Sequence, residues 1–194
     1  MTGRIDSPKQ KFIETALRLF SERGFYGTSL ADVSGELGLT KQSILYHFKT
    51  KEALYGAALE DVAARFDALV NDVIQQDLSA EKKLKTFLAH LLEHTREAPY
   101  DGRLITRELL DNLERVELSR KWYLKNFLAK STSLLEDLPK WRYRTEAERT
   151  AAMYQLIGSI SYFSISEPTL SAIWGTEKLD ETSGAFLSTL VSRI

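Results

Sequence analysis

The segment Thr28–Lys51, TSLADVSGELGLTKQSILYHFKTK, limits the possible folds more than any other part of the 194-residue chain. Ser29 suits the N-cap of a short helix, and Gly38 suits the turn that follows it. Thr40 suits the N-cap of a second short helix that runs to about Phe48. Two short helices joined by a tight turn, the second with a polar first turn, are typical of a helix–turn–helix.

The remainder of the chain also predicts helices. No segment shows the sustained alternation of apolar and polar residues that marks a strand. The prolines, at positions 8, 99, 139 and 168, fit helix starts or loops and leave long uninterrupted stretches between them. We therefore expect an all-α fold, with a first helix that begins after Ser7 and ends at Gly24. Further helices are expected over 51–76, 80–97, 101–116, 118–136, 145–164 and 177–193.

The helix expected over 51–76 would be about 40 Å long, because an α-helix rises 1.5 Å per residue. A helix of that length can join the N-terminal unit mechanically to the rest of the chain. We expect an N-terminal three-helix domain over 1–52, which contains the helix–turn–helix, and a second helical domain over 53–194.

Composition excludes several classes of protein without selecting one. The chain has no cysteine, so disulfides and thiolate metal sites are excluded. The charged N-terminus is unlike a signal peptide, and no window is apolar enough to span a membrane. We expect a cytoplasmic protein without a membrane partner. The net charge is −1, with +2 over residues 1–52, which permits a nucleic-acid-binding face without predicting one.

The polar first turn of the second short helix fits the chemistry of DNA recognition. Glutamine can pair with adenine through two hydrogen bonds, and lysine can donate to guanine, in the major groove. Backbone amides at helix starts bind phosphate, and a neighbouring tyrosine or lysine adds contacts that do not depend on base sequence. The expected DNA-binding residues are Ser29, Thr40, Lys41, Gln42, Ser43, Tyr46, His47 and Lys51.

Small helical trios with a glycine turn also occur in proteins that never meet DNA. On that interpretation the ring of His47 packs inside the trio, which we favour for this residue, and Tyr46 covers the core. The spacing of the two helices alone leaves both interpretations open.

Three consecutive motifs narrow the choice. They are LFSERGF at Leu19–Phe25, TSLADVSGELG at Thr28–Gly38 and LTKQSILYHFKTKEAL at Leu39–Leu54. This pattern closely resembles the tetracycline-repressor (TetR) family of transcriptional regulators, and the run Tyr46–Leu54 is its most specific part. One position departs from the family pattern: the family usually places a tyrosine immediately before Tyr46, and here that residue is Leu45.

The resemblance implies a ligand-responsive regulator of transcription, with the third helix in the major groove of a palindromic DNA operator. It also implies a homodimer, a C-terminal helical domain that binds a small-molecule effector, and weaker operator binding when the effector is bound. We expect a repressor, although the sequence itself does not separate a repressor from an activator. In this pattern Thr40 through Ser43 would face the groove and Lys51, at the start of the fourth helix, would face phosphate.

Aromatic residues are frequent late in the chain, and helical bundles place ligand sites between helices lined by such side chains. Most of these aromatics must still be ordinary core residues. The expected ligand-binding set is Phe87, Leu91, Leu104, Arg107, Trp122, Tyr123 and Phe127.

The last two expected helices carry faces of small and apolar residues that suit close packing between helices. The alternative is that these faces pack within one subunit. We favour a dimer, because a palindromic site needs two recognition helices about 34 Å apart. The expected dimer interface comprises Ala151, Gln155, Gly158, Ser159, Tyr162, Gly184, Phe186, Leu187 and Leu190.

Two polar clusters have competing interpretations. His90, Glu93 and His94 spell HLLEH, which could hold zinc in a metal-dependent enzyme. The surrounding helix is amphipathic and nothing picks out a third ligand, so we expect no metal, no cofactor and no enzyme. A third hypothesis is a helical adaptor for protein partners.

The second polar cluster comprises Arg103, Arg107, Glu108 and Asp111. We favour the interpretation that these residues form solvated ion pairs. The alternative is that they anchor a ligand or clasp two helices together.

Overall fold

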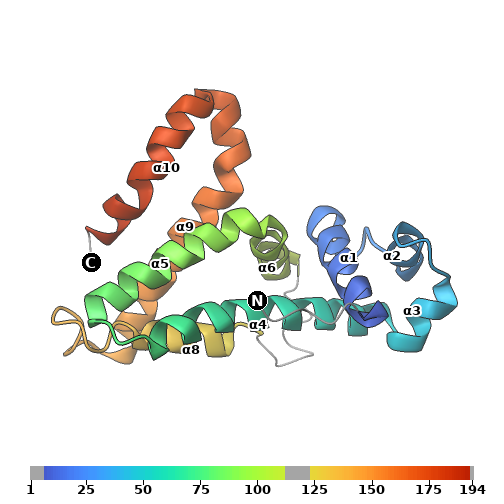
Figure 1. Cartoon of the computed structure of the whole chain (residues 1–194), viewed down its shortest axis with the longest axis horizontal. Coiled ribbons are helices and arrows are strands. Elements are labelled where there is room, and N and C mark those ends of the chain that lie inside the picture. The colour runs from blue at the N-terminus through green and yellow to red at the C-terminus, as the bar shows by residue number, and fades with distance from the viewer. Residues whose placement is uncertain (1–6, 112–122, 193–194) are drawn as a thin grey trace. The chain divides into compact units, whose positions relative to one another are not determined.

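The computed structural model describes residues 7–111 and 123–192, and all regular structure in these residues is helical (Figure 1). The prediction of an all-α fold is confirmed. The helices are α1 (Pro8–Arg23), α2 (Leu30–Glu36), α3 (Lys41–His47), α4 (Lys51–Gln75), α5 (Ala80–Glu97), α6 (Pro99–Asp111), α8 (Lys125–Ser133), α9 (Glu146–Trp174) and α10 (Thr176–Val191).

Most predicted boundaries agree with the structure to within a few residues, but the helix expected over 145–164 is wrong at its end. Helix α9 continues through Pro168 to Trp174. A proline inside a helix removes one backbone donor, and here the helix continues past it until Gly175 adopts a positive φ of 83°. The later parts of the helix expected over 101–116 and the start of that over 118–136 lie outside the described residues.

The chain packs as two compact units. The first comprises residues 1–64 together with 100–123, so it contains α1, α2, α3, the start of α4 and α6. Its core includes the fully buried side chains of Phe12, Phe20, Ile44 and Leu54. The packing units do not test the functional division at residues 52 and 53, which stays a prediction.

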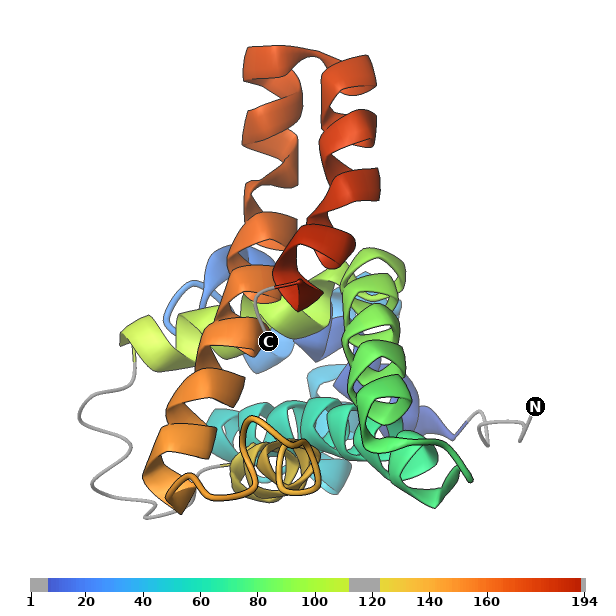
Figure 2. The same cartoon turned by 90° about the vertical axis from the view of Figure 1, so that its left-hand side faces the viewer.

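The second unit comprises residues 65–99 and 124–194 and contains α5, α8, α9, α10 and the end of α4. Its core includes Phe87, Leu88, Leu135 and Met153, all essentially inaccessible to solvent. Helices α9 and α10 run side by side as a hairpin whose turn stands clear of α5 and α8 (Figures 1 and 2). Within the described residues, no helix combines the length and low polarity needed to cross a lipid bilayer.

Candidate nucleic-acid interface

Local capping explains why α2 and α3 begin where they do. Ser29 precedes α2 and forms a reciprocal capping box with Asp32. Thr40 precedes α3, and its hydroxyl accepts a hydrogen bond from the Ser43 amide at 3.3 Å. Gly38 lies between the two helices with a φ of 66°, a conformation that favours glycine. These contacts fix the turn that the sequence predicts.

Helix α3 buries one side and exposes the other. Ile44 is fully buried and Phe48 is 4% exposed, so the helix is anchored by its last turns. In contrast, Thr40, Lys41 and Gln42 are exposed and Ser43 is half-buried. The first turn of α3 therefore presents polar side chains to solvent.

The hydroxyl of Ser29 is already engaged within the capping box. It donates to the Asp32 carboxylate at 2.7 Å and accepts from the Asp32 amide at 3.1 Å. The backbone amide of Ser29 donates to the same carboxylate oxygen at 2.8 Å. These hydrogen bonds, first that from the Ser29 hydroxyl and then that from its amide, lower the pKa of Asp32 below its usual value.

The side chain of Lys51 turns toward its own unit. Its ammonium donates to the Phe25 carbonyl at 2.9 Å and lies 4.2 Å from the centroid of the Phe25 ring. It also lies 6.0 Å from the centroid of Tyr26. Lys51 thus ties the first turn of α4 to the segment between α1 and α2, a role that its place in the sequence motif does not reveal.

The remaining predicted residues of this surface differ in exposure. Tyr46 is 79% exposed and carries its hydroxyl to the surface. His47 is half-buried, and its ring lies 5.8 Å from Phe12 and 5.0 Å from Tyr46. Leu45, at the position where the family pattern has tyrosine, is half-buried. Of the two adjacent positions, Tyr46 has the more accessible side chain.

Helix α6 lies far along the chain but belongs to the first unit, where it forms polar contacts with α1 and α4. The Arg107 guanidinium donates to the carbonyls of Ser21 at 2.7 Å and Glu22 at 2.8 Å, in the last turn of α1. The buried hydroxyl of Tyr55 donates to the Glu108 carboxylate at 2.6 Å. Solvated ion pairing, the favoured interpretation of this cluster, is wrong for Arg107, which clasps two helices.

The contact between Arg107 and Ser21 cannot be predicted from local sequence, because the two residues lie 86 positions apart along the chain. The ring of Tyr55 extends the contact, since it meets Phe20 edge-on at 4.9 Å and Phe25 at 5.1 Å between centroids. A continuous set of packed side chains therefore runs from α6 to the segment before α2.

The predicted ligand-binding residues fall in different places. Phe87, Leu91 and Phe127 are buried in the second unit, where the rings of Phe87 and Phe127 lie 6.0 Å apart. Leu104 is fully buried in the first unit, with Arg107 and Tyr123 in the same unit. Trp122 lies outside the described residues. The assignment of these residues to a ligand stays a prediction.

The predicted dimer residues lie on α9 and α10, and none of them is buried within the chain. Tyr162 is 79% exposed. Phe186 is half-buried and stacks on Phe163 with ring centroids 4.3 Å apart. The surface is accessible to a partner, and its role as an interface stays a prediction.

The HLLEH segment gains no third ligand in the described parts of the chain, where no group of three His, Cys, Asp or Glu side chains is placed to hold a metal. His94 meets the edge of Phe66 at 5.2 Å between centroids. His90 is half-buried on the same helix.

Comparison with known proteins gives these features a context. Residues 12–58 match the family model described as bacterial regulatory proteins, tetR family. The HTH-type transcriptional regulator RutR of Escherichia coli (strain K12) is 24% identical over 177 residues, 91% of this chain and 83% of that protein. The biofilm operon icaADBC HTH-type negative transcriptional regulator IcaR of Staphylococcus aureus (strain Newman) is 32% identical over 85 residues, 44% of each chain.

A solved structure shares the whole fold. The fatty acid degradation regulator FadR from Bacillus halodurans superposes with a TM-score of 0.75 at 16% identity, covering 97% of both chains. The likeness extends from the N-terminal helix–turn–helix through the C-terminal helical domain, which confirms the predicted architecture. Together with the family model matched over residues 12–58 and the related regulators, this likeness supports a TetR-family transcriptional regulator.

Proposed function

We propose that the protein is a homodimeric repressor that places the first turn of α3 in the major groove of a palindromic operator and releases it when a small molecule binds. The observation that carries this proposal is the outward-facing turn Thr40–Ser43, capped by Thr40 and held by buried Ile44. Short polar side chains on the first turn of a helix can approach base edges without steric obstruction. Gln42 and Lys41 would read bases, and Thr40 and Ser43 would complete the contact.

Phosphate contacts would come from the edges of this surface. Backbone amides at the starts of α2 and α4 would donate to phosphate oxygens, and the exposed Tyr46 would add a contact through its hydroxyl. Ser29 would contribute through its helix start, because its hydroxyl is engaged by Asp32. His47 would support the surface from beneath through its contact with Phe12.

Lys51 has a different part in the proposal. In the free protein its ammonium holds the Phe25 carbonyl, so its first effect is to fix α4 against the segment that leads into α2.

Regulation would use α4 and α6, the two helices at which the chain passes between the two units. Helix α4 contributes residues to both units, and α6 grips the end of α1 through Arg107. An effector that binds one arrangement of these helices better than another shifts the population toward that arrangement. The predicted effector set of Phe87, Leu91, Leu104, Arg107, Trp122, Tyr123 and Phe127 is retained with Arg107 as a coupling residue rather than a direct contact.

The test begins with selection of binding sites from a pool of random DNA duplexes, followed by fluorescence anisotropy at several salt concentrations. A saturable complex with a palindromic site is expected. Gln42→Ala should weaken that complex by about 1–3 kcal/mol and relax preference at one base pair. Gln75→Ala, an exposed position at the end of α4, is the matched control and should leave affinity unchanged.

The same assay separates the two roles of Lys51. If Lys51 mainly holds α4 against the segment before α2, Lys51→Ala lowers the free energy of unfolding and leaves the salt dependence of DNA binding unchanged. This is the result we expect. A salt slope reduced by about one would instead assign Lys51 a direct phosphate contact. Failure to select any DNA sequence from the pool would contradict the proposed function as a whole.

A further inference from the structure

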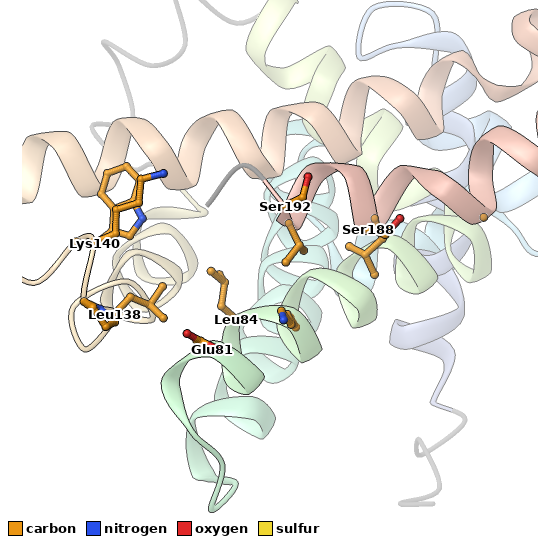
Figure 3. A pocket seen from close by; sticks show the side chains of 12 residues that line it. Glu81, Leu84, Leu138, Lys140, Ser188 and Ser192 are labelled. Carbon is orange, nitrogen blue, oxygen red and sulfur yellow. The ribbon is translucent and has the colours of Figure 1, made fainter.

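A cleft of about 790 Å³ opens in the second unit, away from the buried aromatic residues of the predicted ligand set. Its walls are the start of α5, the segment over 138–141 that follows α8, and the last turns of α10 (Figure 3). The volume falls in the range of about 300–1,000 Å³ that is usual for small-molecule sites. Side chains from the three walls converge on it, among them Glu81, Leu84, Leu138, Lys140, Ser188 and Ser192.

The base of the cleft is apolar and firmly held. Leu84 is 3% exposed and Leu138 is 5% exposed, so both belong to the core and cannot move freely. Leu187 and Val191 of α10 face the cleft from the other side, and the indole of Trp141 contributes a flat wall. Walls made largely of aliphatic side chains favour an aliphatic portion of a ligand, because its burial removes apolar surface from water.

The charged groups around the cleft favour an anionic head group. Lys85 and Lys140 line it together with a single carboxylate, that of Glu81. The two serines of α10 use their hydroxyl hydrogens on backbone carbonyls, Ser188 on Ala185 and Ser192 on Thr189. The lysines therefore provide the cationic donors of the cleft, and a carboxylate matches them better than an amine does.

Trp141 adds a second, independent observation. Its indole nitrogen is buried and has no acceptor among the described residues. A buried donor without a partner is costly, and most such groups in proteins are satisfied by protein, water or ligand. An acceptor atom that reached the indole from the cleft would remove this cost.

We propose that the cleft binds an amphipathic carboxylic acid, with its aliphatic chain between α5 and α10 and its carboxylate at Lys85 and Lys140. Gly184 and Leu187 line the cleft and also belong to the predicted dimer interface. A bound acid would therefore contact one of the helices that we assign to dimerisation. Binding itself does not depend on the proposed function, whereas its consequence for operator binding does.

The experiment uses the full chain with Trp122→Phe and Trp174→Phe, which leaves Trp141 as the only tryptophan of the three. Its fluorescence is titrated with dodecanoate, dodecanol and dodecylamine below their aggregation concentrations. The proposal expects a saturable change with dodecanoate and at least about tenfold weaker binding of the alcohol and the amine, which cannot form charge-assisted hydrogen bonds to the lysines as a carboxylate does. Equal affinities for the three head groups, or no saturable change, would overturn it.

Two variants locate the site. Lys85→Glu should weaken dodecanoate about tenfold and leave dodecanol unaffected, because it removes a charge-assisted hydrogen bond to the carboxylate and reverses one charge at the cleft. Lys82→Glu is the matched control, since Lys82 is an exposed residue of the same helix that does not line the cleft. Ser188→Phe fills the cleft from an exposed position of α10 and should remove binding of both compounds. Equal effects of the two lysine variants, or full binding by Ser188→Phe, would overturn the site.

A gel shift with the selected operator separates this inference from the proposed function. Dodecanoate is expected to change the operator affinity of the wild type and not that of Lys85→Glu. Dodecanoate binding without any operator complex would overturn the proposed function and uphold the site. A normal operator complex in a protein that does not bind dodecanoate would do the reverse.

Discussion

The first unit and the α9–α10 hairpin differ in how far their large apolar side chains are buried. In the first unit the large apolar residues of α1, among them Phe12 and Phe20, are buried, and Arg107 caps the carbonyls at the end of α1. In the hairpin, α10 has no buried residue, and Tyr162 and Ile173 of α9 are 79% and 67% exposed. The large apolar residues of α1 are covered within one chain, whereas several of those in the hairpin stay exposed.

This difference indicates what each region is for. Apolar side chains that remain exposed together mark surfaces for association, whereas single exposed apolar residues are ordinary. The exposed polar turn of α3 is held in place by the buried side chain of Ile44, which suits recognition of a fixed partner such as DNA. The hairpin carries exposed apolar groups on a long helical pair, which suits burial against a second copy of the chain.

The largest predicted effect tests this contrast at the hairpin. Tyr162→Glu places a charge on the predicted dimer interface and should weaken dimerisation by about 3 kcal/mol or more, because truncation or charging of a central aromatic residue has effects of this size. Size-exclusion chromatography with light scattering should show a monomer at micromolar concentration. The secondary structure should remain, since the side chain is exposed in the single chain.

Tyr143→Glu is the matched control for this change. Tyr143 is 90% exposed and precedes α9, outside the predicted interface, so the same substitution there should leave the dimer intact. If both variants stay dimeric with unchanged dissociation constants, the hairpin is not the interface, and the contrast between the two regions loses its explanation.

The next prediction tests the contact between α6 and α1 within the first unit. Arg107→Ala removes two hydrogen bonds from a guanidinium to carbonyls of α1, and bonds to charged groups contribute about 1.5–3 kcal/mol. We expect a loss of about 2 kcal/mol in the free energy of unfolding, measured by urea denaturation. Operator affinity should fall with it, because the end of α1 supports the helices that follow.

Arg103→Ala controls for the loss of an arginine from the same helix. Arg103 is exposed, and surface changes of this kind usually alter stability by less than about 0.5 kcal/mol. Similar losses in the two variants would show that helix propensity or net charge, rather than the clasp between α6 and α1, accounts for the effect of Arg107.

Local features of this fold could be predicted from the sequence because they depend on neighbours. Ser29 and Thr40 mark the starts of α2 and α3, and Gly38 marks the turn between them, through interactions that span three or four residues. The family motif over Tyr46–Leu54 adds the architecture. The exposed turn of α3 follows from the burial of Ile44 on its opposite face.

Contacts between distant segments could not be predicted in the same way. Nothing local indicates that Arg107 would find α1, or that Lys51 would turn to the Phe25 carbonyl 26 residues earlier. Tertiary packing decides these two cases, and its effect exceeds that of local preference. The sequence also predicts too short an α9, because Pro168 is a helix breaker in isolation, whereas the helix continues through it to Trp174.

The smallest effect concerns the surface cap of the first unit and depends on pH. Hydrogen bonds from Ser29 lower the pKa of Asp32, so the unfolded chain binds this proton more readily than the folded one. The contribution is therefore complete above the ordinary value of 3.8 and is lost as the pH falls through the lower pKa of the folded state. Asp32→Ala should lower the urea midpoint at pH 6, and the difference from wild type should shrink toward pH 3.

Ser29→Ala provides the partner measurement, because it removes the hydroxyl that makes the largest contribution to the shift. It should reduce the same pH dependence, and the two changes together should have less effect than their sum, since they act on one capping box. Additive effects, or a difference that grows toward low pH, would mean that the carboxylate acts elsewhere. A loss of stability that is non-additive in the two variants and shrinks toward low pH would instead show that Ser29 and Asp32 satisfy each other at an exposed position of the first unit. Within the described residues, the exposed apolar side chains of the hairpin have no such local partner to cover them.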